Sequence, residues 1–544
     1  MQTVHLASHP APCPEPFNLA AYVLAHADRL ADKTALQILR PTGAERWSYA
    51  KLQSTVRGTA TGLLALGLPQ GAKILLRLGN GPEFPVAFLG AIAAGFVPVP
   101  TSAELTHAEI TRMAASLAPD LVIAEDGIAA PDGIHLLSAQ DLRSFADLPP
   151  APYDLGSPER LAYMVYTSGT SGQPRAVMHA HRAVWARQMM HRDWYDLRES
   201  DRVLHAGAFN WTYTLGTGLL DPWSVGATAL IPQSGVETRT IPLLLKRFDA
   251  TIFAAAPGVY GQILKHHTKI SAPKLRHGLS AGETMSAGLK SAWETATTTP
   301  VYEALGLSEC STFLSAAPTR PAPTGMTGWP QRGRRIAVLL EDGEISELSS
   351  DVSAACDVTG ARDLCGELLV HESDQGLFLG YHNAADETAA RRQGDWFRTG
   401  DTVRICAQTG AAQVLGRQSD LMNAGGFRVS PLEVERAFET LAQAGDFAAA
   451  ELRLNEDVSI IALGYTGDAP REAFEARAAR DLARYKQPRA YLRLDGLPSN
   501  ANGKLNRARL AAKLAQLLRA PTESPDPDAR AAPKSSFENP DASG

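Results

Sequence analysis

The chain has 544 residues, of which 44% are hydrophobic and 20% are charged, a composition typical of folded globular proteins and unlike that of disordered ones. With 52 Lys and Arg against 58 Asp and Glu, the net charge of −6 is too small to attract nucleic acid or an anionic membrane across the whole molecule. Five widely spaced cysteines without a C-x-x-C pair argue against a disulfide scaffold or a zinc site, and they favour a cytoplasmic protein.

The first eighteen residues contain no cationic segment followed by an apolar run, so we expect no signal peptide. The most apolar window, 84–100, holds three prolines and two glycines. This pattern fits a buried helix that leads into a buried strand better than a bilayer span, so we expect no stable membrane insertion.

Between residues 51 and 305, short apolar runs alternate with stretches of helical periodicity. The predicted strands occupy 73–78, 121–124, 161–166, 202–206, 227–231, 251–255 and 301–305, and the predicted helices 179–191, 241–248 and 286–295. Such alternation is typical of parallel sheets with helices on their faces, and the expected fold class is therefore α/β.

After residue 318 the expected strands, 335–340 and 366–370, are separated by turn residues and predict a small β-rich subdomain. A last α+β unit has predicted helices at 431–441 and 474–485 and predicted strands at 460–464 and 490–493. Residues 520–544 are rich in Pro, Ser, Asp and Ala, which predicts a disordered tail.

A glycine-rich loop follows the predicted strand at 161–166. Its candidate phosphate-binding residues are Thr167, Ser168, Gly169, Thr170, Ser171, Gly172 and Arg175. Glycines let the backbone approach a polyphosphate, hydroxyls and N–H groups donate hydrogen bonds, and the arginine supplies positive charge. The spacing differs from the G-x-x-x-x-G-K-[ST] loop of common nucleotide triphosphatases. An ordinary surface loop rich in Ser and Gly is the alternative.

Residues 166–175 resemble the signature loop of the adenylate-forming superfamily, which includes acyl-CoA synthetases, peptide-synthetase adenylation domains and luciferases; Arg175 stands where lysine is more frequent. Four further segments match in the expected order, and the resemblance covers about 18–518. It implies a large N-terminal domain, 1–417, of parallel-sheet αβαβα subdomains plus the β-rich subdomain. A small, mobile α+β domain, 418–519, would follow. The implied cofactors are ATP, Mg²⁺ and CoA.

The second and third segments are 305–309 and 396–401. The resemblance implies that Ser308 touches the α-phosphate, that Glu309 helps to hold Mg²⁺, and that Asp401 accepts hydrogen bonds from the ribose hydroxyls. Leu305 replaces the usual aromatic residue that stacks on adenine. Taken alone, Ser308 and Glu309 also fit a helix N-terminus, and Asp401 a turn.

The fourth and fifth segments are 415–429 and 497–507. By resemblance, Arg417 reaches the ribose, Ser419 is the hinge in place of the commoner Asp or Lys, and Gly425 and Gly426 line the channel for the CoA thiol. Lys504 stabilises the negative charge that grows as the carboxylate attacks the α-phosphorus. Glycine turns are the simpler alternative for both segments.

Segments 205–213, 221–227 and 278–283 look most like the benzoate–CoA ligase branch. The resemblance, together with that of the segment around 303–306, implies an acid pocket lined by Ala208, Phe209, Trp211, Tyr213 and Gly306. It implies that the residues beside the nucleotide are Ser280, Gly282, Glu283, Glu303, Ala304 and Leu305. Aromatic residues at this spacing also fit an ordinary core.

The expected function is an ATP-dependent carboxylic acid–CoA ligase. It would activate a small aromatic or compact apolar acid as acyl-AMP, release pyrophosphate and transfer the acyl group to CoA. CoA is favoured as the acceptor because no carrier domain follows residue 519. The alternatives are an adenylating enzyme that loads a carrier protein, a ligase for short or medium-chain fatty acids, and a non-catalytic nucleotide-binding protein. The expected partners are the acid and CoA, without nucleic acid, and a dimer is compatible with the sequence.

Overall fold

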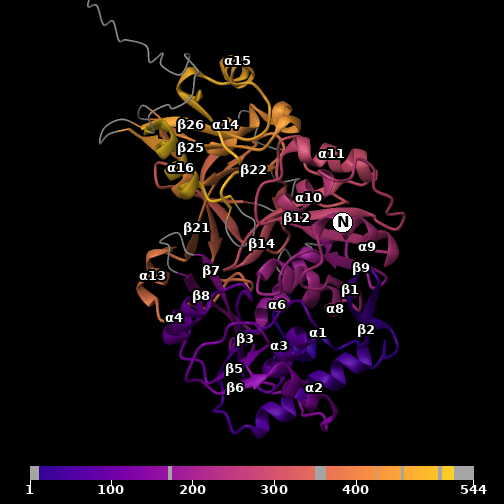
Figure 1. Cartoon of the computed structure of the whole chain (residues 1–544). Coiled ribbons are helices and arrows are strands. Elements are labelled where there is room, and N and C mark those ends of the chain that lie inside the picture. The colour runs from indigo at the N-terminus through magenta and orange to yellow at the C-terminus, as the bar shows by residue number, and fades with distance from the viewer. Residues whose placement is uncertain are drawn as a thin grey trace, which may run out of the picture.

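The computed structural model describes residues 11–168, 174–348, 363–424, 427–454, 459–499 and 505–519. The elements up to β22 form a large body, and the C-terminal elements, orange to yellow in Figure 1, gather at one end of it. The expected disordered tail, 520–544, lies outside the described residues.

The largest sheet has nine strands in the order β15-β14-β13-β12-β11-β9-β10-β1-β2. Its inner neighbours, from β13 to β1, pair in parallel, whereas β2, β14 and β15 pair antiparallel at the edges. The strands are β1 (Thr34–Arg40), β2 (Gly43–Ser48), β9 (Arg202–His205), β10 (Thr228–Pro232), β11 (Ile252–Ala255), β12 (His277–Ala281), β13 (Val301–Leu307), β14 (Ser311–Ser315) and β15 (Trp329–Pro330). The predicted α/β class is thereby confirmed.

A second, parallel sheet has the order β4-β3-β5-β6. Its strands are β3 (Lys73–Arg77), β4 (Val97–Pro100), β5 (Leu121–Ala124) and β6 (Leu136–Ser138). The window at 84–100 forms the buried helix α3 (Glu83–Ala93) and the buried strand β4, as predicted.

The remaining helices of the large body lie over these sheets or in their connections. Ser48, Thr106 and Ser286 cap α2, α4 and α11 by accepting hydrogen bonds from backbone N–H groups. The helices are α1 (Leu19–Val23), α2 (Tyr49–Ala65), α4 (His107–Leu117), α5 (Ala139–Ser144), α6 (Arg182–Ala186), α7 (Gln188–Met190), α8 (Asp221–Ser224), α9 (Ile241–Arg247), α10 (Pro257–Leu264), α11 (Ala287–Thr297) and α13 (Ala385–Ala390). None of the helices in the described ranges has the length and apolar character needed to span a bilayer.

The predicted β-rich part contains a sheet in the order β17-β16-β18-β21-β20, with β22 paired to β21. These strands are β16 (Ile336–Leu339), β17 (Ile345–Leu348), β18 (Leu364–His371), β20 (Arg392–Gln393), β21 (Trp396–Ile405) and β22 (Ala412–Arg417). A separate antiparallel sheet joins β7 (Leu161–Ser168), β8 (Pro174–Ala180) and β19 (Gly380–Tyr381).

The C-terminal unit has cores of its own, which draw on residues from Met422 to Leu514. It consists of a three-stranded sheet, a two-stranded hairpin and helices. Its elements are β23 (Met422–Ala424), β24 (Phe427–Val429), α14 (Pro431–Arg436), η6 (Glu439–Ala444), β25 (Phe447–Arg453), β26 (Ser459–Tyr465), α15 (Arg471–Asp481), β27 (Ala490–Arg493) and α16 (Arg507–Arg519).

Three predicted helices are wrong in part. The helix predicted at 474–485 runs instead from Arg471 to Asp481, and a 3₁₀ turn, Arg484–Lys486, follows it. In the segment 179–191, His179 and Ala180 end strand β8, because β8 pairs with β7, and only then do α6 and α7 follow. The helix predicted at 431–441 ends at Arg436 and is followed by the 3₁₀ segment η6.

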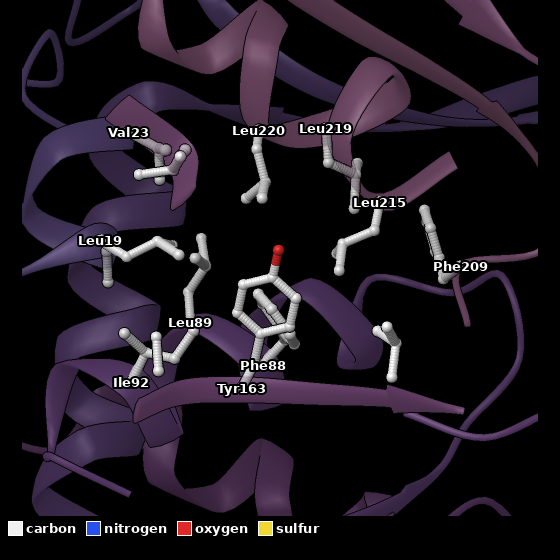
Figure 2. Packing of buried hydrophobic residues seen from close by; sticks show 14 of the residues in the cluster. Leu19, Val23, Phe88, Leu89, Ile92, Tyr163, Phe209, Leu215, Leu219 and Leu220 are labelled. Carbon is white, nitrogen blue, oxygen red and sulfur yellow. The ribbon is translucent and has the colours of Figure 1, made fainter. Parts of the chain in front are cut away.

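The core beside the β7–β8 hairpin unites three segments that lie far apart in the sequence. Figure 2 shows Leu19 of α1, Leu89 of α3 and Leu220 of η3 (Thr214–Leu220, a π-helical segment) around Tyr163 of β7. Each fully buried side chain of this kind contributes about 1.5–3 kcal/mol. This packing holds η3 against the hairpin.

Candidate active site

The glycine-rich loop is the tip of an antiparallel hairpin. Thr167 of β7 pairs with Arg175 of β8, so the two strands bring both ends of the loop together. Gly169, Thr170, Ser171 and Gly172 lie outside the described residues, as does the side chain of Ser168. The hairpin nevertheless fixes where the loop begins and ends.

Arg175 leaves this loop beside two side chains from the segment 380–390. Its guanidinium forms an ion pair with Glu387 of α13, and its Cζ atom lies 5.5 Å from the ring centroid of Tyr381. A polyphosphate that binds Arg175 therefore has to compete with the carboxylate of Glu387.

Ser308 and Glu309 lie in the turn between β13 and β14. They do not begin a helix, so the helix-cap alternative is wrong. The hydroxyl of Tyr381 donates a 2.6 Å hydrogen bond to Oε1 of Glu309, and the backbone N–H of Phe378 donates to the carbonyl oxygen of Glu309 over 2.7 Å. The carboxylate thus has a defined position opposite the hairpin.

Asp401 and Arg417 are paired residues of β21 and β22. Asp401 lies within a strand, so the turn alternative for this residue is wrong. Its Oδ1 atom is 2.9 Å from Nε of Arg417, whereas its buried Oδ2 atom has no hydrogen-bond partner among the described residues. A buried carboxylate oxygen without a donor fits the expected bond to a ribose hydroxyl.

The pKa of Asp401 is raised to about 6. Burial is the main cause, and the nearby charge of Glu309 adds to it, whereas the guanidinium of Arg417 acts in the opposite direction. The charge of Glu309 therefore acts on Asp401 although 92 positions separate them in the sequence.

The expected nucleotide-side residues lie at the ends of β12 and β13, which are neighbours in the sheet. Ser280 is fully buried, and its hydroxyl has no partner within the described chain. Gly282 adopts φ +94°, a conformation that favours glycine. Glu283 accepts a 3.1 Å hydrogen bond from the backbone N–H of Leu505.

The other residues expected on this side belong to β13. Glu303 is buried and binds Nζ of Lys290 over 2.6 Å and the N–H of Met285 over 3.0 Å, so its carboxylate already has protein donors. Ala304 is buried and Leu305 half-buried. Gly306 lies so close to β14 that any side chain would collide with the backbone there.

The expected pocket residues differ in their surroundings. Phe209 is buried and stacks on Phe84 with ring centroids 4.8 Å apart, which agrees with the core alternative. Tyr213 is buried, donates to the carbonyl oxygen of Leu279 over 3.0 Å and meets the half-buried Trp211 edge to face at 5.2 Å. Ala208 is exposed.

Three expected site residues of the C-terminal part lie outside the described residues, namely Gly425, Gly426 and Lys504, and so does the side chain of Ser419. The backbone of Ser419 is part of η5 (Gln418–Asp420). The hydrogen bond from Leu505 to Glu283 brings the residue after Lys504 to the end of β12.

The sequence reasoning missed Tyr381, Glu387 and Thr212. Tyr381 and Glu387 meet Glu309 and Arg175 through contacts that bridge more than 70 positions, and no local pattern reports such contacts. Thr212 lies between the two expected pocket aromatics Trp211 and Tyr213. This position between two expected pocket residues was the sequence signal that could have identified Thr212 as a further candidate.

Among the described residues, no group of three or more His, Cys, Asp or Glu side chains could hold a metal ion. Mg²⁺ prefers oxygen ligands and commonly binds through one or two carboxylates together with phosphates and water. The single carboxylate of Glu309 opposite the hairpin fits that kind of site, with the nucleotide supplying further oxygens.

Comparison with known proteins shows the family of the chain. Residues 23–382 match the sequence model of a family described as AMP-binding enzyme. The chain is 28% identical over 504 residues to a benzoate–CoA ligase of Thauera aromatica, covering 86% of this chain and 91% of that protein. It is 29% identical over 492 residues to a 4-hydroxybenzoate–CoA/benzoate–CoA ligase of Rhodopseudomonas palustris, with 85% and 88% covered.

A solved structure is also similar. A benzoate CoA ligase from Burkholderia xenovorans LB400 superimposes with a TM-score of 0.78 and 25% identity, covering 91% of this chain and all of that one. The family model spans well over half of the sequence and includes the glycine-rich hairpin and the Ser308–Glu309 turn. The chain therefore belongs to the AMP-binding enzyme family.

Proposed function

We propose that the protein is an ATP-dependent carboxylic acid–CoA ligase that forms an acyl-AMP intermediate. The observation that carries the proposal is the convergence of Arg175, Glu309, Asp401 and Arg417 from four separate segments of the chain. Arg175 would meet the phosphates, Glu309 the magnesium ion, and Asp401 with Arg417 the ribose. Bound Mg²⁺ would neutralise phosphate charge and polarise the α-phosphate.

The reaction would have two halves. The acid's carboxylate oxygen attacks the α-phosphorus of ATP, pyrophosphate leaves, and acyl-AMP forms. The CoA thiol then attacks the acyl carbon, AMP leaves, and the thiol proton passes to solvent. Lys504 would stabilise the charge in the first half, and Gly425 and Gly426 would line the thiol channel in the second.

The two halves would require the C-terminal unit to rotate about Ser419. This assignment is supported by the connection itself: β22 ends at Arg417 in the large body, whereas β23 packs against β26 of the C-terminal unit. Between them lies the short segment η5. The proposed domain boundary therefore lies at 417/418, and a cytoplasmic location remains a prediction.

The proposed acid is a small aromatic or compact apolar carboxylic acid. Relatives named for benzoate and hydroxybenzoate support this choice. A panel of acids incubated with the protein, ATP, Mg²⁺ and CoA tests it, with AMP release and the mass of the thioester as readouts. Reaction with straight-chain acids but not with benzoate-like acids would exclude the aromatic acid.

The role of Lys504 has its own test. Lys504→Ala should abolish acyl-AMP formation and spare thioester formation from acyl-AMP added ready-made. Lys513→Ala, an exposed position on α16, is the matched control and should leave both halves unchanged. Equal loss of both halves in Lys504→Ala would refute the role.

Thioester formation only on an added carrier protein would favour the carrier-loading alternative.

A further inference from the structure

A small cavity lies between η3 and the turn that carries Ser308. Its volume is about 20 Å³, which accommodates one water molecule or one hydroxyl group but no aromatic ring. Its polar lining comes from β7, β8, the residue after α6, the segment before η3, the β13–β14 turn and the start of β14: Tyr163, His179, Arg187, Thr212, Ser308 and Ser311. The cavity is polar enough to hold a hydrogen-bonded guest.

His179 is the side chain in this lining that most needs a partner. It is 3% exposed, and neither ring nitrogen makes a hydrogen bond of good geometry within the described residues. Burial lowers its pKa to about 3, although a hydrogen bond with the backbone of Ser308, which falls short of good geometry, acts in the opposite direction. The ring is therefore neutral at physiological pH and offers one donor and one acceptor.

The positive charge in the lining is already neutralised. Arg187 donates from Nε and Nη2 to the buried carboxylate of Asp221 over 2.7 and 2.6 Å, and from Nη1 to Oγ of Ser311 over 2.5 Å. A carboxylate of a guest in this cavity would therefore find the guanidinium of Arg187 already paired with Asp221. The geometry favours a neutral guest.

The apolar walls restrict the guest further. Figure 2 shows the hydroxyl of Tyr163 pointing toward Leu215 and Leu220, which also line the cavity. The ring of Tyr163 stacks on His179, with centroids 4.8 Å apart, so the imidazole is held in place. A compact hydroxyl fits between these walls.

We propose that this cavity binds one neutral hydroxyl group, with His179 as its hydrogen-bond partner. The hydroxyl comes either from the ring of a hydroxylated aromatic acid or from a water molecule. The first source rests on the proposed function. It is supported by Ser308, the expected α-phosphate contact, and by Thr212, which lies between the expected pocket residues Trp211 and Tyr213.

The first arm of the test measures substrate selection. kcat/KM is determined for benzoate and its three monohydroxy isomers, in the native protein and in His179→Leu. If the acid supplies the hydroxyl, the preference for one isomer over benzoate falls at least about tenfold in His179→Leu. In the native protein benzoate leaves the buried imidazole without a partner, and the variant has no imidazole to leave unpaired. His277→Leu is the matched control, since His277 is also a buried histidine with an unpaired Nε2. Its preference should stay unchanged.

The second arm is a high-resolution crystal structure of the acid-free protein. A water within hydrogen-bond distance of His179, together with unchanged selectivity in His179→Leu, identifies water as the source. An empty cavity together with unchanged selectivity overturns the proposal. Thr212→Val, which removes one lining hydroxyl at nearly constant volume, replaces His179→Leu if that variant does not fold. If no acid supports AMP release, the proposed function fails, and the crystal structure still tests the cavity.

Discussion

The two carboxylate oxygens of Asp401 differ, and this difference leads to a pH-dependent prediction. Oδ1 is paired with Arg417 at 2.9 Å, and the buried Oδ2 lacks a partner within the described chain. Burial raises the pKa of Asp401 to about 6. Protonation would therefore compete with the proposed ribose contact in a pH range where most proteins remain folded.

The size of the effect follows from this pKa. A carboxyl group with a pKa of about 6 is roughly nine-tenths ionised at pH 7 and roughly one-tenth ionised at pH 5. If the ionised form is the one that accepts hydrogen bonds from both ribose hydroxyls, the affinity for the nucleoside falls about tenfold between pH 7 and pH 5. This loss corresponds to about 1.4 kcal/mol of binding free energy.

Adenosine is the appropriate ligand for the assay, because phosphate groups themselves titrate at about pH 6. Its Kd is measured by calorimetry from pH 5 to pH 8. Asp401→Asn should bind adenosine more weakly and without this pH dependence. Arg417→Leu removes the charge that lowers the pKa of Asp401, so its inflection should move to higher pH. A pH-independent Kd in the native protein, or the native inflection in Asp401→Asn, would refute the reasoning.

Three further predictions concern the same region. Tyr381→Phe removes the 2.6 Å hydrogen bond to Glu309, and we expect a several-fold higher Mg²⁺ requirement for ATP binding, measured by calorimetry; an unchanged requirement contradicts the role of Tyr381. Glu387→Gln removes the carboxylate that competes for Arg175, so pyrophosphate should bind more tightly, and weaker binding would show that Glu387 instead helps to position Arg175. The pKa of Asp401 is raised from 3.8 to about 6 in the folded state. The free energy of unfolding should therefore fall by on the order of 3 kcal/mol as the pH rises through these two values, because the buried carboxyl resists ionisation. The free energy of urea unfolding is measured for the native protein and for Asp401→Asn from pH 4 to pH 7. The difference between the two proteins should change with pH, and a difference that is the same at every pH would contradict the prediction.

Some elements could be predicted because their signal is local. The helix and strand at 84–100 were predictable, since continuous burial requires a continuous apolar run. The β7–β8 hairpin was predicted only up to the loop. The predicted helix at 179–191 included His179 and Ala180, which belong to strand β8 through its pairing with β7. The preference of a short segment is readily overridden by such pairing.

The candidate site divides in the same way. The glycine-rich loop and the residues Ser308, Glu309, Asp401 and Arg417 stand in local motifs, so they could be proposed from the chain. The role of Phe209 could not be decided, because pocket and core aromatics have the same spacing and only the stack on Phe84 tells them apart. The cavity at His179 was equally inaccessible, since its lining comes from five separate parts of the chain.

By itself, the sequence determined the α/β class, the order of the motifs and the candidate side chains for binding phosphate, ribose and metal. These properties depend on residue identity and on short spacings along the chain. Only the tertiary structure decided that Tyr381 holds Glu309, that Glu387 occupies Arg175, and that one oxygen of Asp401 stays unpaired in a buried position. Hydrogen bonds, burial and pKa depend on distances between atoms that packing brings together, and separation along the chain does not encode those distances.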